Sequence, residues 1–392
     1  MNPNIVIFNY REFNVNIGGI ERVSVSLAKS LLEKGFKVIL VAVYRTKYTI
    51  PYSPPLPIHF LPSNDTLSPD NVTAFNKILV DNNVHIVINQ DAHALASHVL
   101  CHSAIQGTSA KLIAALHFCP TQRLLLYKHP WDSNIFSLKD NIVRLLKSLA
   151  YKYPFRIYTT QDVRRHFHKM YAESNSVVVL SKKYISEYVR LGGLKESKKL
   201  VGINYMLSFP LKSYNAKKEK RLLFCARMDI QKRPERALYI WSKLHNKLID
   251  WTFDLVGDGP LLPRLMSLSE KLHLKNIEFH GFKNPKPFYE KSSIYILTSD
   301  YEGWGLTITE AMQNRCVPVI MNTFASASEI VDNGENGFLI PEFNCEAMAN
   351  HVYELATNNA LWRDMSEAAI RKMRQFAPEV IVANWMKLFN DI

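Results

Sequence analysis

The sequence predicts an α/β protein with two βα domains in tandem, each organised around a parallel sheet. Its 392 residues exceed what one hydrophobic core usually holds, so we expect two domains of roughly 150–200 residues. Short runs that are apolar on both faces alternate with helical patterns in both halves, which is typical of parallel sheets covered by helices. The hydrophobic content of 47% and the charged content of 21% are those of a globular chain.

The first domain is predicted at residues 1–207. It begins with a strand over Asn4–Phe8, a glycine-containing loop, and a helix over Glu21–Glu33 whose apolar residues recur at helical spacing. A stretch between Phe118 and Tyr171 is rich in aromatic and basic residues, and we predict a loop followed by a long helix there. Apolar runs predict five further strands: Lys37–Tyr44, Ile58–Leu61, Val84–Asn89, Lys111–Leu116 and Ser176–Leu180.

A polar, aperiodic stretch at 208–220 contains Pro210 and is predicted to be the linker between the domains. The second domain is predicted at 221–375, and residues 376–392 are expected to form a C-terminal helix that crosses back to the first domain. We expect a ligand in the cleft where the carboxyl ends of the strands of the two domains face each other. The predicted strands of the second domain are Arg221–Cys225, Trp251–Val256, Ile277–His280, Ile294–Thr298 and Val317–Met321, and its first helices are Pro234–Lys247, Leu261–Leu272 and one beginning at Leu306.

The positive charge is concentrated in the first half of the chain. Residues 1–210 contain 25 Lys and Arg against 13 Asp and Glu, a net of +12. Residues 211–392 contain 23 against 22, so the two parts sum to the net charge of +13. This asymmetry indicates an anionic partner for one domain, with ordinary solubilising charge as the alternative. Because no zinc finger, RRM or other recognition motif is present, we predict no nucleic-acid partner and keep an anionic membrane surface as the candidate.

Cysteine spacing and hydropathy set the expected compartment. No pair of cysteines has CxxC spacing, which argues against a disulfide framework or a zinc cage. No apolar stretch approaches 18 residues, and the first strand is too short for the apolar region of a secretory signal. We therefore expect a cytoplasmic protein that contacts the inner face of the cell membrane. The basic, aromatic-containing stretches expected to make this contact are Lys152–Arg156, Arg164–Lys169 and Lys182 with Lys183.

Two adjacent glycines, Gly18 and Gly19, lie in the loop between the first predicted strand and the first helix. They would let a ligand approach the backbone and would leave N–H groups at the positive end of the helix. The loop lacks GxGxxG spacing and no acidic residue closes the second strand, which disfavours a dinucleotide-dependent dehydrogenase. A plain left-handed turn is the alternative interpretation.

Two cations follow the first strand of the second domain. Arg227 comes just after the strand, and Lys232 lies five residues later, ahead of Pro234 at a predicted helix start. Two cations beside a helix N-terminus would neutralise a diphosphate, although a basic turn alone is a weak signal. The next strand ends in a tight turn, Gly257-Asp258-Gly259, which we expect to expose further backbone N–H groups.

The strongest signal lies at residues 300–312, where a predicted strand runs into a glycine-containing turn and then a helix. Phosphate oxygens are expected to bind the amides of Gly305 to Thr307 at the start of this helix. Glu302 precedes the helix and Glu310 lies one to two turns inside it, so they are expected to contact different parts of an extended ligand. The alternative is that Glu302 interacts with the helix dipole and Glu310 is a surface residue.

Together these residues resemble the retaining glycosyltransferases of family 4. The resemblance covers nearly the whole chain and is strongest from 221 to 341, where His280-Gly281-Phe282 also matches. It implies a GT-B fold, in which two Rossmann-like domains face each other across a central cleft. Asn204-Tyr205 departs from the Asn-Pro usual in the family, a difference expected to affect the hinge more than the chemistry. The matching features are the E-x7-E spacing of Glu302 and Glu310, the pair Arg227 and Lys232, the Gly257-Asp258-Gly259 turn, and the Gly18-Gly19 loop.

The resemblance implies a role for each matching residue. Arg227 and Lys232 would hold the diphosphate of the sugar donor and stabilise the leaving group, and Glu302 would contact the transferred sugar. His117 matches a position where the family often has a histidine near the reacting sugar, with a structural histidine as the alternative. No metal ion and no cofactor are expected. The remaining donor-binding residues implied are Glu310 at the ribose, Phe282 beside the nucleobase, the backbone of Gly303, Gly305, Leu306 and Thr307 at the phosphates, the Gly257 turn, and Gly18 with Gly19 beside the diphosphate and sugar.

We therefore predict a retaining glycosyltransferase that moves a hexose or hexosamine from a nucleotide-diphosphate sugar to a growing, lipid-linked surface glycan such as a capsule, O-antigen or lipopolysaccharide. One alternative is a sugar-nucleotide epimerase of similar fold, which would need catalytic carboxylates such as Glu21 and Asp91. Another is an enzyme like glycogen or sucrose synthase, which uses the same motifs with a different acceptor. The last is a non-catalytic subunit of a glycan-assembly complex.

Overall fold

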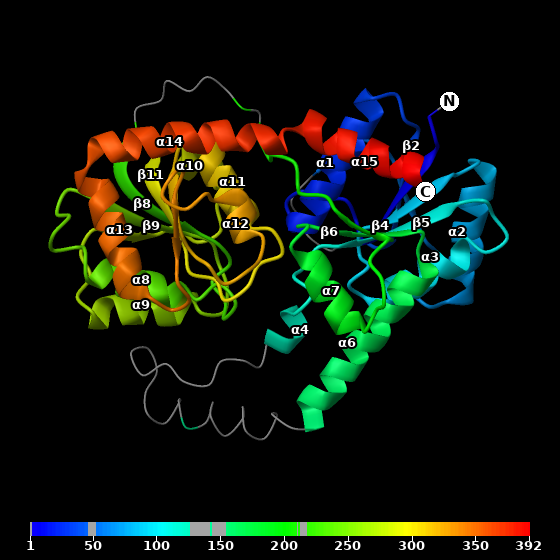
Figure 1. The fold of residues 1–392 in the computed structure, drawn as a ribbon, viewed down its shortest axis with the longest axis horizontal. Coiled ribbons are helices and arrows are strands. Elements are labelled where there is room, and N and C mark those ends of the chain that lie inside the picture. The colour runs from blue at the N-terminus through cyan, green and yellow to red at the C-terminus, as the bar shows by residue number, and fades with distance from the viewer. Residues whose placement is uncertain (1, 46–51, 126–141, 143–153, 210, 212–217) are drawn as a thin grey trace. The chain divides into compact units, whose positions relative to one another are not determined.

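The computed structural model describes residues 2–45, 52–125, 142, 154–209, 211 and 218–392 (Figure 1). The chain divides into two compact units, each with one parallel sheet. The described parts of 2–125, 154–206 and 378–392 form the N-terminal unit, and those of 207–377 form the C-terminal unit. The prediction of two parallel-sheet α/β domains is confirmed. Within the described residues, no helix combines the length and the hydropathy needed to cross a bilayer.

The N-terminal unit contains a seven-stranded sheet with the order β3-β2-β1-β4-β5-β6-β7, in which every neighbouring pair is parallel. Its strands are β1 (Ile5–Arg11), β2 (Val38–Tyr44), β3 (Ile58–Phe60), β4 (Ile86–Asn89), β5 (Lys111–Leu116), β6 (Ser176–Val179) and β7 (Leu200–Gly202). Its helices are α1 (Gly19–Glu33), α2 (Pro69–Asp81), α3 (Leu95–Ala104), α4 (Gln122–Leu125), α6 (Pro154–Glu173), α7 (Tyr184–Gly192) and α15 (Pro378–Asp391).

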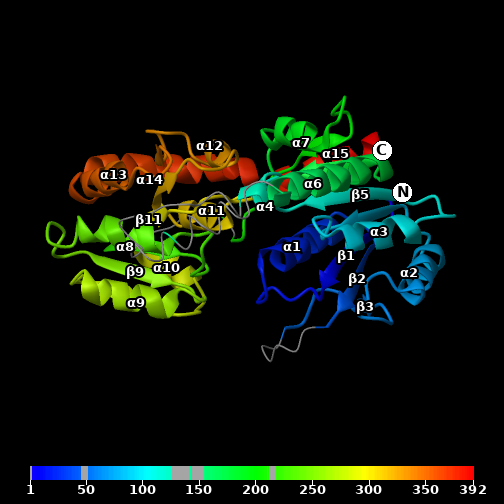
Figure 2. The same ribbon diagram turned by 90° about the horizontal axis from the view of Figure 1, so that it is seen from below.

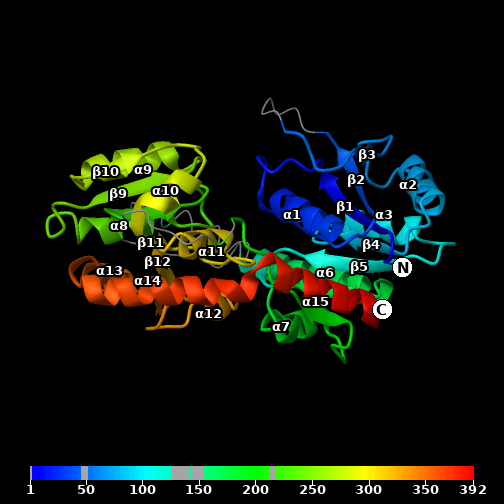
Figure 3. The same ribbon diagram turned by 90° about the horizontal axis from the view of Figure 1, so that it is seen from above.

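Alternate residues of β1 supply two cores, one on each face of this sheet. Ile5 and Ile7 pack in the core that contains side chains of α1 and α15, and these two helices contact each other (Figure 1). Figure 3 shows the same unit from above. Val6 and Phe8 pack in the opposite core with α2 and α3. Because both faces of β1 are buried, its sequence from Ile5 to Phe8 is a continuous apolar run. Beyond β5, the long helix α6 runs alongside α7 (Figure 2).

The C-terminal unit contains a six-stranded parallel sheet with the order β10-β9-β8-β11-β12-β13. Side chains of α8, α9 and α13 share a core with β8, β9, β11 and β12. Its strands are β8 (Glu219–Cys225), β9 (Thr252–Val256), β10 (Ile277–Phe279), β11 (Ser292–Leu297), β12 (Val317–Met321) and β13 (Phe338–Ile340). Its helices are α8 (Pro234–Ser242), α9 (Leu262–Lys271), α10 (Lys286–Lys291), α11 (Leu306–Gln313), α12 (Ala327–Ile330), α13 (Cys345–Thr357), α14 (Asn359–Met373) and the short 3-10 helix η1 (Arg374–Phe376).

Most boundaries differ from those predicted by one to three residues, and the end of α8 differs by five. The helix expected over 234–247 ends at Ser242, because the chain continues in tight turns such as Leu244 N–H to Trp241 C=O. Leu244 and Leu248 are buried and lie four residues apart, a spacing typical of a helix, which is why the helix was predicted to continue. Strand β8 begins at Glu219, inside the stretch expected to be linker, of which residues 210 and 212–217 lie outside the described residues.

Candidate active site

The charged residues expected in the second domain lie at the carboxyl ends of two neighbouring strands. Arg227 and Lys232 belong to the loop between β8 and α8, whereas Glu302 belongs to the loop between β11 and α11. Because β8 and β11 are paired in parallel, both loops leave the same edge of the sheet. Glu310 lies within α11. The topology therefore brings these residues to one edge of the C-terminal unit.

Lys232 and Glu302 are in direct contact. The Lys232 ammonium donates to both carboxylate oxygens of Glu302 at 2.6 and 2.7 Å, and the side chains are only 20% and 9% exposed. The Ser299 hydroxyl donates to Oε1 of the same carboxylate at 2.7 Å. An ammonium has three donors, so these two bonds leave one N–H that a ligand could use. The resemblance implies that Lys232 contacts the diphosphate and that Glu302 contacts the sugar. In the structure without a ligand, the two side chains form an ion pair with each other.

Arg227 is placed differently from Lys232. Its side chain is 72% exposed, and its Nε lies 3.6 Å from Oδ2 of Asp229, a residue of the same loop. An exposed ion pair at this distance is weak. Arg227 therefore carries a solvated charge at the carboxyl end of β8.

Glu310 is 1% exposed, so the alternative that it is a surface residue is wrong. Its Oε2 accepts a hydrogen bond from the Tyr289 hydroxyl at 3.0 Å. Burial raises the pKa of Tyr289 well above its usual value, which keeps this hydroxyl protonated as a donor. The carboxylate of Glu310 is therefore held in position by a neighbouring helix, α10.

The turn before α11 depends on a glycine. Gly305 has φ +94°, and a Cβ there would lie 2.7 Å from Cδ1 of Ile308. The helix begins at Leu306, as predicted, and the first N–H groups of a helix have no carbonyl partner within it. Thr307 is also fixed through its side chain, because the Tyr295 hydroxyl donates to its Oγ1 at 2.7 Å. The start of α11, where phosphate binding was predicted, is thus fixed by the backbone conformation of Gly305 and by the Tyr295–Thr307 hydrogen bond.

In the Gly257-Asp258-Gly259 turn, where exposed N–H groups were predicted, the amides of both glycines have partners within the chain. Gly257 N–H donates to Gly281 C=O at 2.8 Å, and Gly259 N–H donates to the Asp258 carboxylate at 2.6 Å. A Cβ on Gly257, which has φ +133°, would lie 2.0 Å from the Ala226 carbonyl oxygen. The glycine therefore allows close packing of the turn against the loop that carries Arg227. Phe282, after Gly281, is 69% exposed and accessible to a planar ligand.

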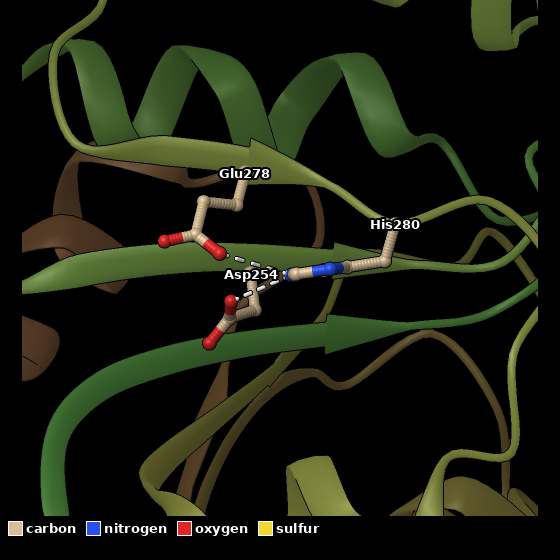
Figure 4. Close-up of side chains that lie close together, drawn as sticks. All are labelled: Asp254, Glu278 and His280. Carbon is tan, nitrogen blue, oxygen red and sulfur yellow. Dashed lines mark hydrogen bonds and ion pairs between the residues drawn. The ribbon is translucent and has the colours of Figure 1, made fainter.

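A charged cluster missed by the sequence reasoning lies on β8, β9 and β10. The side chains of Asp254, Glu278 and His280 point toward one another (Figure 4), and their ligand atoms lie within 4.8 Å of each other. Arg221 donates to both oxygens of Asp254 at 2.9 and 3.0 Å, and His280 Nε2 lies 2.8 Å from Oδ1. The buried carboxylate thus already has a guanidinium and an imidazole as partners. Through the His280–Asp254 contact, the cluster fixes the end of β10 against β9, two residues before Phe282.

His117 follows β5 in the N-terminal unit and is buried. Its Nδ1 lies 2.5 Å from the Tyr205 hydroxyl, and its Nε2 lies 2.6 Å from Oε1 of Gln90. Burial lowers its pKa to about 3, so the ring is neutral. Tyr205, at a departure from the family pattern that was expected to affect the hinge more than the chemistry, contacts the candidate catalytic histidine. Both ring nitrogens are therefore engaged within the chain.

Gly18 and Gly19 do not form the left-handed turn considered as an alternative. Gly18 is extended, with φ −167°, and Gly19 is the first residue of α1. A Cβ on Gly18 would lie 2.6 Å from a carboxylate oxygen of Glu21, so a side chain there would displace Glu21. Burial raises the pKa of Glu21 and also that of Asp91. Asp91 accepts from the Ser97 hydroxyl at 2.7 Å and is therefore held by α3.

Comparison with known proteins identifies the family. The model for "Glycosyltransferase Family 4" matches residues 17–181, and the model for "Glycosyl transferases group 1" matches residues 210–372. An uncharacterized glycosyltransferase of Haemophilus influenzae is 25% identical over 384 residues, which cover 95% of this chain and 97% of that protein. The poly(ribitol-phosphate) alpha-N-acetylglucosaminyltransferase of Staphylococcus aureus is 27% identical over 229 residues, 54% of this chain and 46% of that one.

The same architecture occurs in solved structures. HepE of Anabaena, solved in complex with UDP and glucose, matches with a TM-score of 0.73 and 15% identity over all of both chains. At this identity the match establishes the fold, which is GT-B. The two family models fall one on each of the two sheets described above. The chain thus belongs to the glycosyltransferases of family 4.

Proposed function

We propose that this glycosyltransferase moves a hexose or hexosamine from a nucleoside-diphosphate sugar to a growing surface glycan, with retention of configuration and without an essential metal or cofactor. The observation that carries the proposal is the Lys232–Glu302 pair beside the start of α11. A fixed ammonium and the first amides of a helix suit a diphosphate leaving group.

The proposed chemistry follows the charge that develops during transfer. Breaking the bond between sugar and phosphate leaves negative charge on the diphosphate and positive character on the sugar. Lys232 and the Leu306 and Thr307 amides would stabilise the departing diphosphate, with the exposed Arg227 as a second cation. Glu302 would contact the transferred sugar. The acceptor hydroxyl would attack from the face that the diphosphate leaves and would pass its proton to an oxygen of the departing diphosphate, so that no protein nucleophile takes part.

Two further residues of the C-terminal unit complete the proposed site for the sugar donor. Glu310, held by Tyr289, would accept hydrogen bonds from the ribose hydroxyls. Phe282, which is exposed after β10, would lie beside the base. A uridine nucleotide is the first candidate, because HepE has been solved with UDP and glucose.

The proposed acceptor is a lipid-linked polymer at the inner face of the cell membrane. The Staphylococcus aureus relative supports a polymeric acceptor through its name, which specifies poly(ribitol-phosphate). Helix α6 exposes Arg164, Arg165 and Lys169, and Lys182 with Lys183 is exposed before α7, so that one unit presents several cations. Anionic lipid attracts each such cation by about 1 kcal/mol. The stretch Lys152–Arg156 lies outside the residues whose side chains are described.

Turnover of sugar donors by the purified protein tests the proposal. UDP-, GDP- and ADP-sugars are compared by thermal shift and by donor hydrolysis, with and without EDTA. Lys232→Ala should lower hydrolysis by about 10²–10³-fold, the usual loss for one such stabilising group. Lys243→Ala is the matched control, because Lys243 pairs with Glu346 at 2.7 Å on the surface of the same unit. Equal hydrolysis by wild type and Lys232→Ala would contradict the proposal, and inhibition by EDTA would contradict its metal-independent form.

Sedimentation with vesicles tests the membrane contact separately. The wild type should bind vesicles that contain anionic lipid at low salt and release them at high salt, since exposed charges are screened. Replacing Arg164 and Arg165 together with Glu should abolish this binding without affecting donor hydrolysis. Binding that does not respond to salt would contradict an electrostatic contact.

A further inference from the structure

We propose that Asp300 is a positioning residue that fixes the loop carrying Lys232, so that Lys232 and Glu302 are oriented before a ligand binds. This inference rests on the proposed function, because it concerns the same site. Asp300 lies in the loop after β11, two residues before Glu302, and it is buried. Neither sequence spacing nor the resemblance assigned it a role.

The residue that follows Lys232 has an unfavourable backbone conformation. Arg233 has φ +50° and ψ +50°, the left-handed region that residues with a side chain rarely occupy. Pro234 follows it and disfavours the right-handed alternative at the preceding position. Such a conformation persists only where surrounding contacts hold it. The loop therefore needs an external restraint at the position next to Lys232.

Asp300 supplies that restraint through its two carboxylate oxygens. Oδ2 accepts a hydrogen bond from Arg233 Nε, and Oδ1 accepts one from Arg236 at 2.7 Å. Arg236 also donates to the Thr298 carbonyl at 3.1 Å, and Glu235 lies 3.5 Å from Arg233. All four charged residues are buried, and their two positive and two negative charges balance. Charge-assisted hydrogen bonds in such a buried site are strong and directional.

Backbone bonds tie the same two loops together around this charge cluster. Asp300 N–H donates to Gln231 C=O at 2.9 Å, and the Gln231 side-chain amide donates to Tyr301 C=O at 2.9 Å. The Thr298 hydroxyl lies 3.0 Å from the Lys232 carbonyl and 2.8 Å from that of Arg233, and donates to one of them at a time. The loops are thus joined on both sides of the Lys232–Glu302 pair. The position of Lys232 is set by these bonds in addition to its own bond to Glu302.

Asp300→Asn tests the role with little change in shape. The amide oxygen can accept from one guanidinium, while the amide NH2 group faces the other and cannot accept. One of the two guanidinium groups then loses its acceptor and the cluster loses one negative charge, so the restraint on the left-handed conformation of Arg233 weakens and the loop gains alternative conformations. A displacement of ~1 Å in a group that stabilises the transition state lowers turnover about 10²-fold. We expect kcat for donor hydrolysis to fall by about ten- to a hundredfold, with a smaller change in KM.

A double-mutant cycle with Lys232→Ala separates positioning from general support of the fold. If Asp300 acts through Lys232, Asp300→Asn should lower kcat by less than about twofold in the Lys232→Ala background. The same loss in both backgrounds would overturn the proposal, because it would show an effect independent of Lys232. An unchanged kcat in the single variant Asp300→Asn would overturn it as well.

Arg233→Gly provides a rescue experiment, because glycine adopts φ +50° without a restraining carboxylate. In the Asp300→Asn background it should recover at least about threefold in kcat, since the loop regains its conformation. His273→Gly is the matched control: His273 also has φ +50° and is exposed between α9 and β10. Recovery by His273→Gly, or none by Arg233→Gly, would overturn the proposal.

Hydrogen exchange distinguishes failure of this inference from failure of the proposed function. If the wild type neither binds nor hydrolyses any nucleotide sugar, the proposed function fails. The positioning role is then decided by amide exchange at 228–232, where Met228 and Lys232 N–H groups are hydrogen-bonded. Faster exchange there in Asp300→Asn, with exchange at β12 unchanged, supports the restraint. Equal exchange in both proteins overturns it.

Discussion

Acidification tests the buried, neutral state of His117. The imidazole has a pKa of about 3 in the folded chain, because it is buried between Gln90 and Tyr205. In the unfolded chain its pKa is about 6.5. Between these values the unfolded state binds a proton that the folded state does not, so the free energy of unfolding must fall as the pH falls.

The size of the effect follows from the same two pKa values. Each pH unit below about 6.5 lowers the free energy of unfolding by about 1.4 kcal/mol for one such group. His117 alone should therefore lower it by about 2 kcal/mol between about pH 6.5 and 5. His98 and His166, whose pKa values burial lowers to about 4, act in the same direction. The total acid sensitivity thus exceeds what His117 contributes.

Comparison with His117→Gln isolates the histidine. Glutamine is polar but does not titrate, while His98 and His166 remain in both proteins. Urea denaturation followed by circular dichroism gives the free energy of unfolding at several pH values. The difference between wild type and variant should shrink by about 2 kcal/mol from about pH 6.5 to 5. A difference that does not change with pH would refute the assignment of a neutral, buried imidazole.

Three further substitutions test contacts within one unit or the other. Gly257→Ala should lower Tm far more than Gly281→Ala. A Cβ at position 257 would lie 2.0 Å from the Ala226 carbonyl oxygen, whereas a Cβ at position 281 would have no atom within 4 Å. Equal Tm values for the two variants would contradict this. Tyr289→Phe should lower the free energy of unfolding by about 1–3 kcal/mol, since buried Glu310 loses a hydrogen-bond donor, and a denaturation curve that matches the wild type would refute this. Trp385→Ala should lower the free energy of unfolding of the N-terminal unit by about 3–5 kcal/mol, because Trp385 lies in its core. Limited proteolysis should then cut the N-terminal unit first, and cleavage that begins in the C-terminal unit would contradict this.

The sequence was sufficient for the order of most elements, because their signals are local, but the three-residue strand β13 was not predicted. Apolar runs located the strands to within a few residues, and the glycine-containing turns marked the ends of β9 and β11. The loops that carry Lys232 and Glu302 were also predicted, since strand, turn and helix follow one another there. Buried strands and special backbone conformations restrict the choice of residue at each position, which is why they can be recognised in one sequence.

The partners of these residues could not be predicted, because they are set by tertiary structure. Lys232 and Glu302 are 70 residues apart, and nothing in either loop specifies that they pair. Tyr205 was interpreted as a hinge residue, whereas its hydroxyl contacts His117 from 88 residues away. The amide of Gly257 was expected to be free, and its acceptor lies on a different strand end. Hydrogen-bond partners of this kind depend on strand order and register, which local patterns leave open.

Helix α15 affects how the chain folds during synthesis. Ile381, Trp385 and Phe389 fill a core whose other walls are made of β1, β2 and α1, near the beginning of the chain. When the ribosome has made the first 207 residues, that core still lacks one wall, and its apolar surface stays exposed while the next 170 or so residues are added. The first unit to be synthesised is therefore the last to be completed. A nascent chain held before residue 378 should need chaperone protection that the finished chain does not.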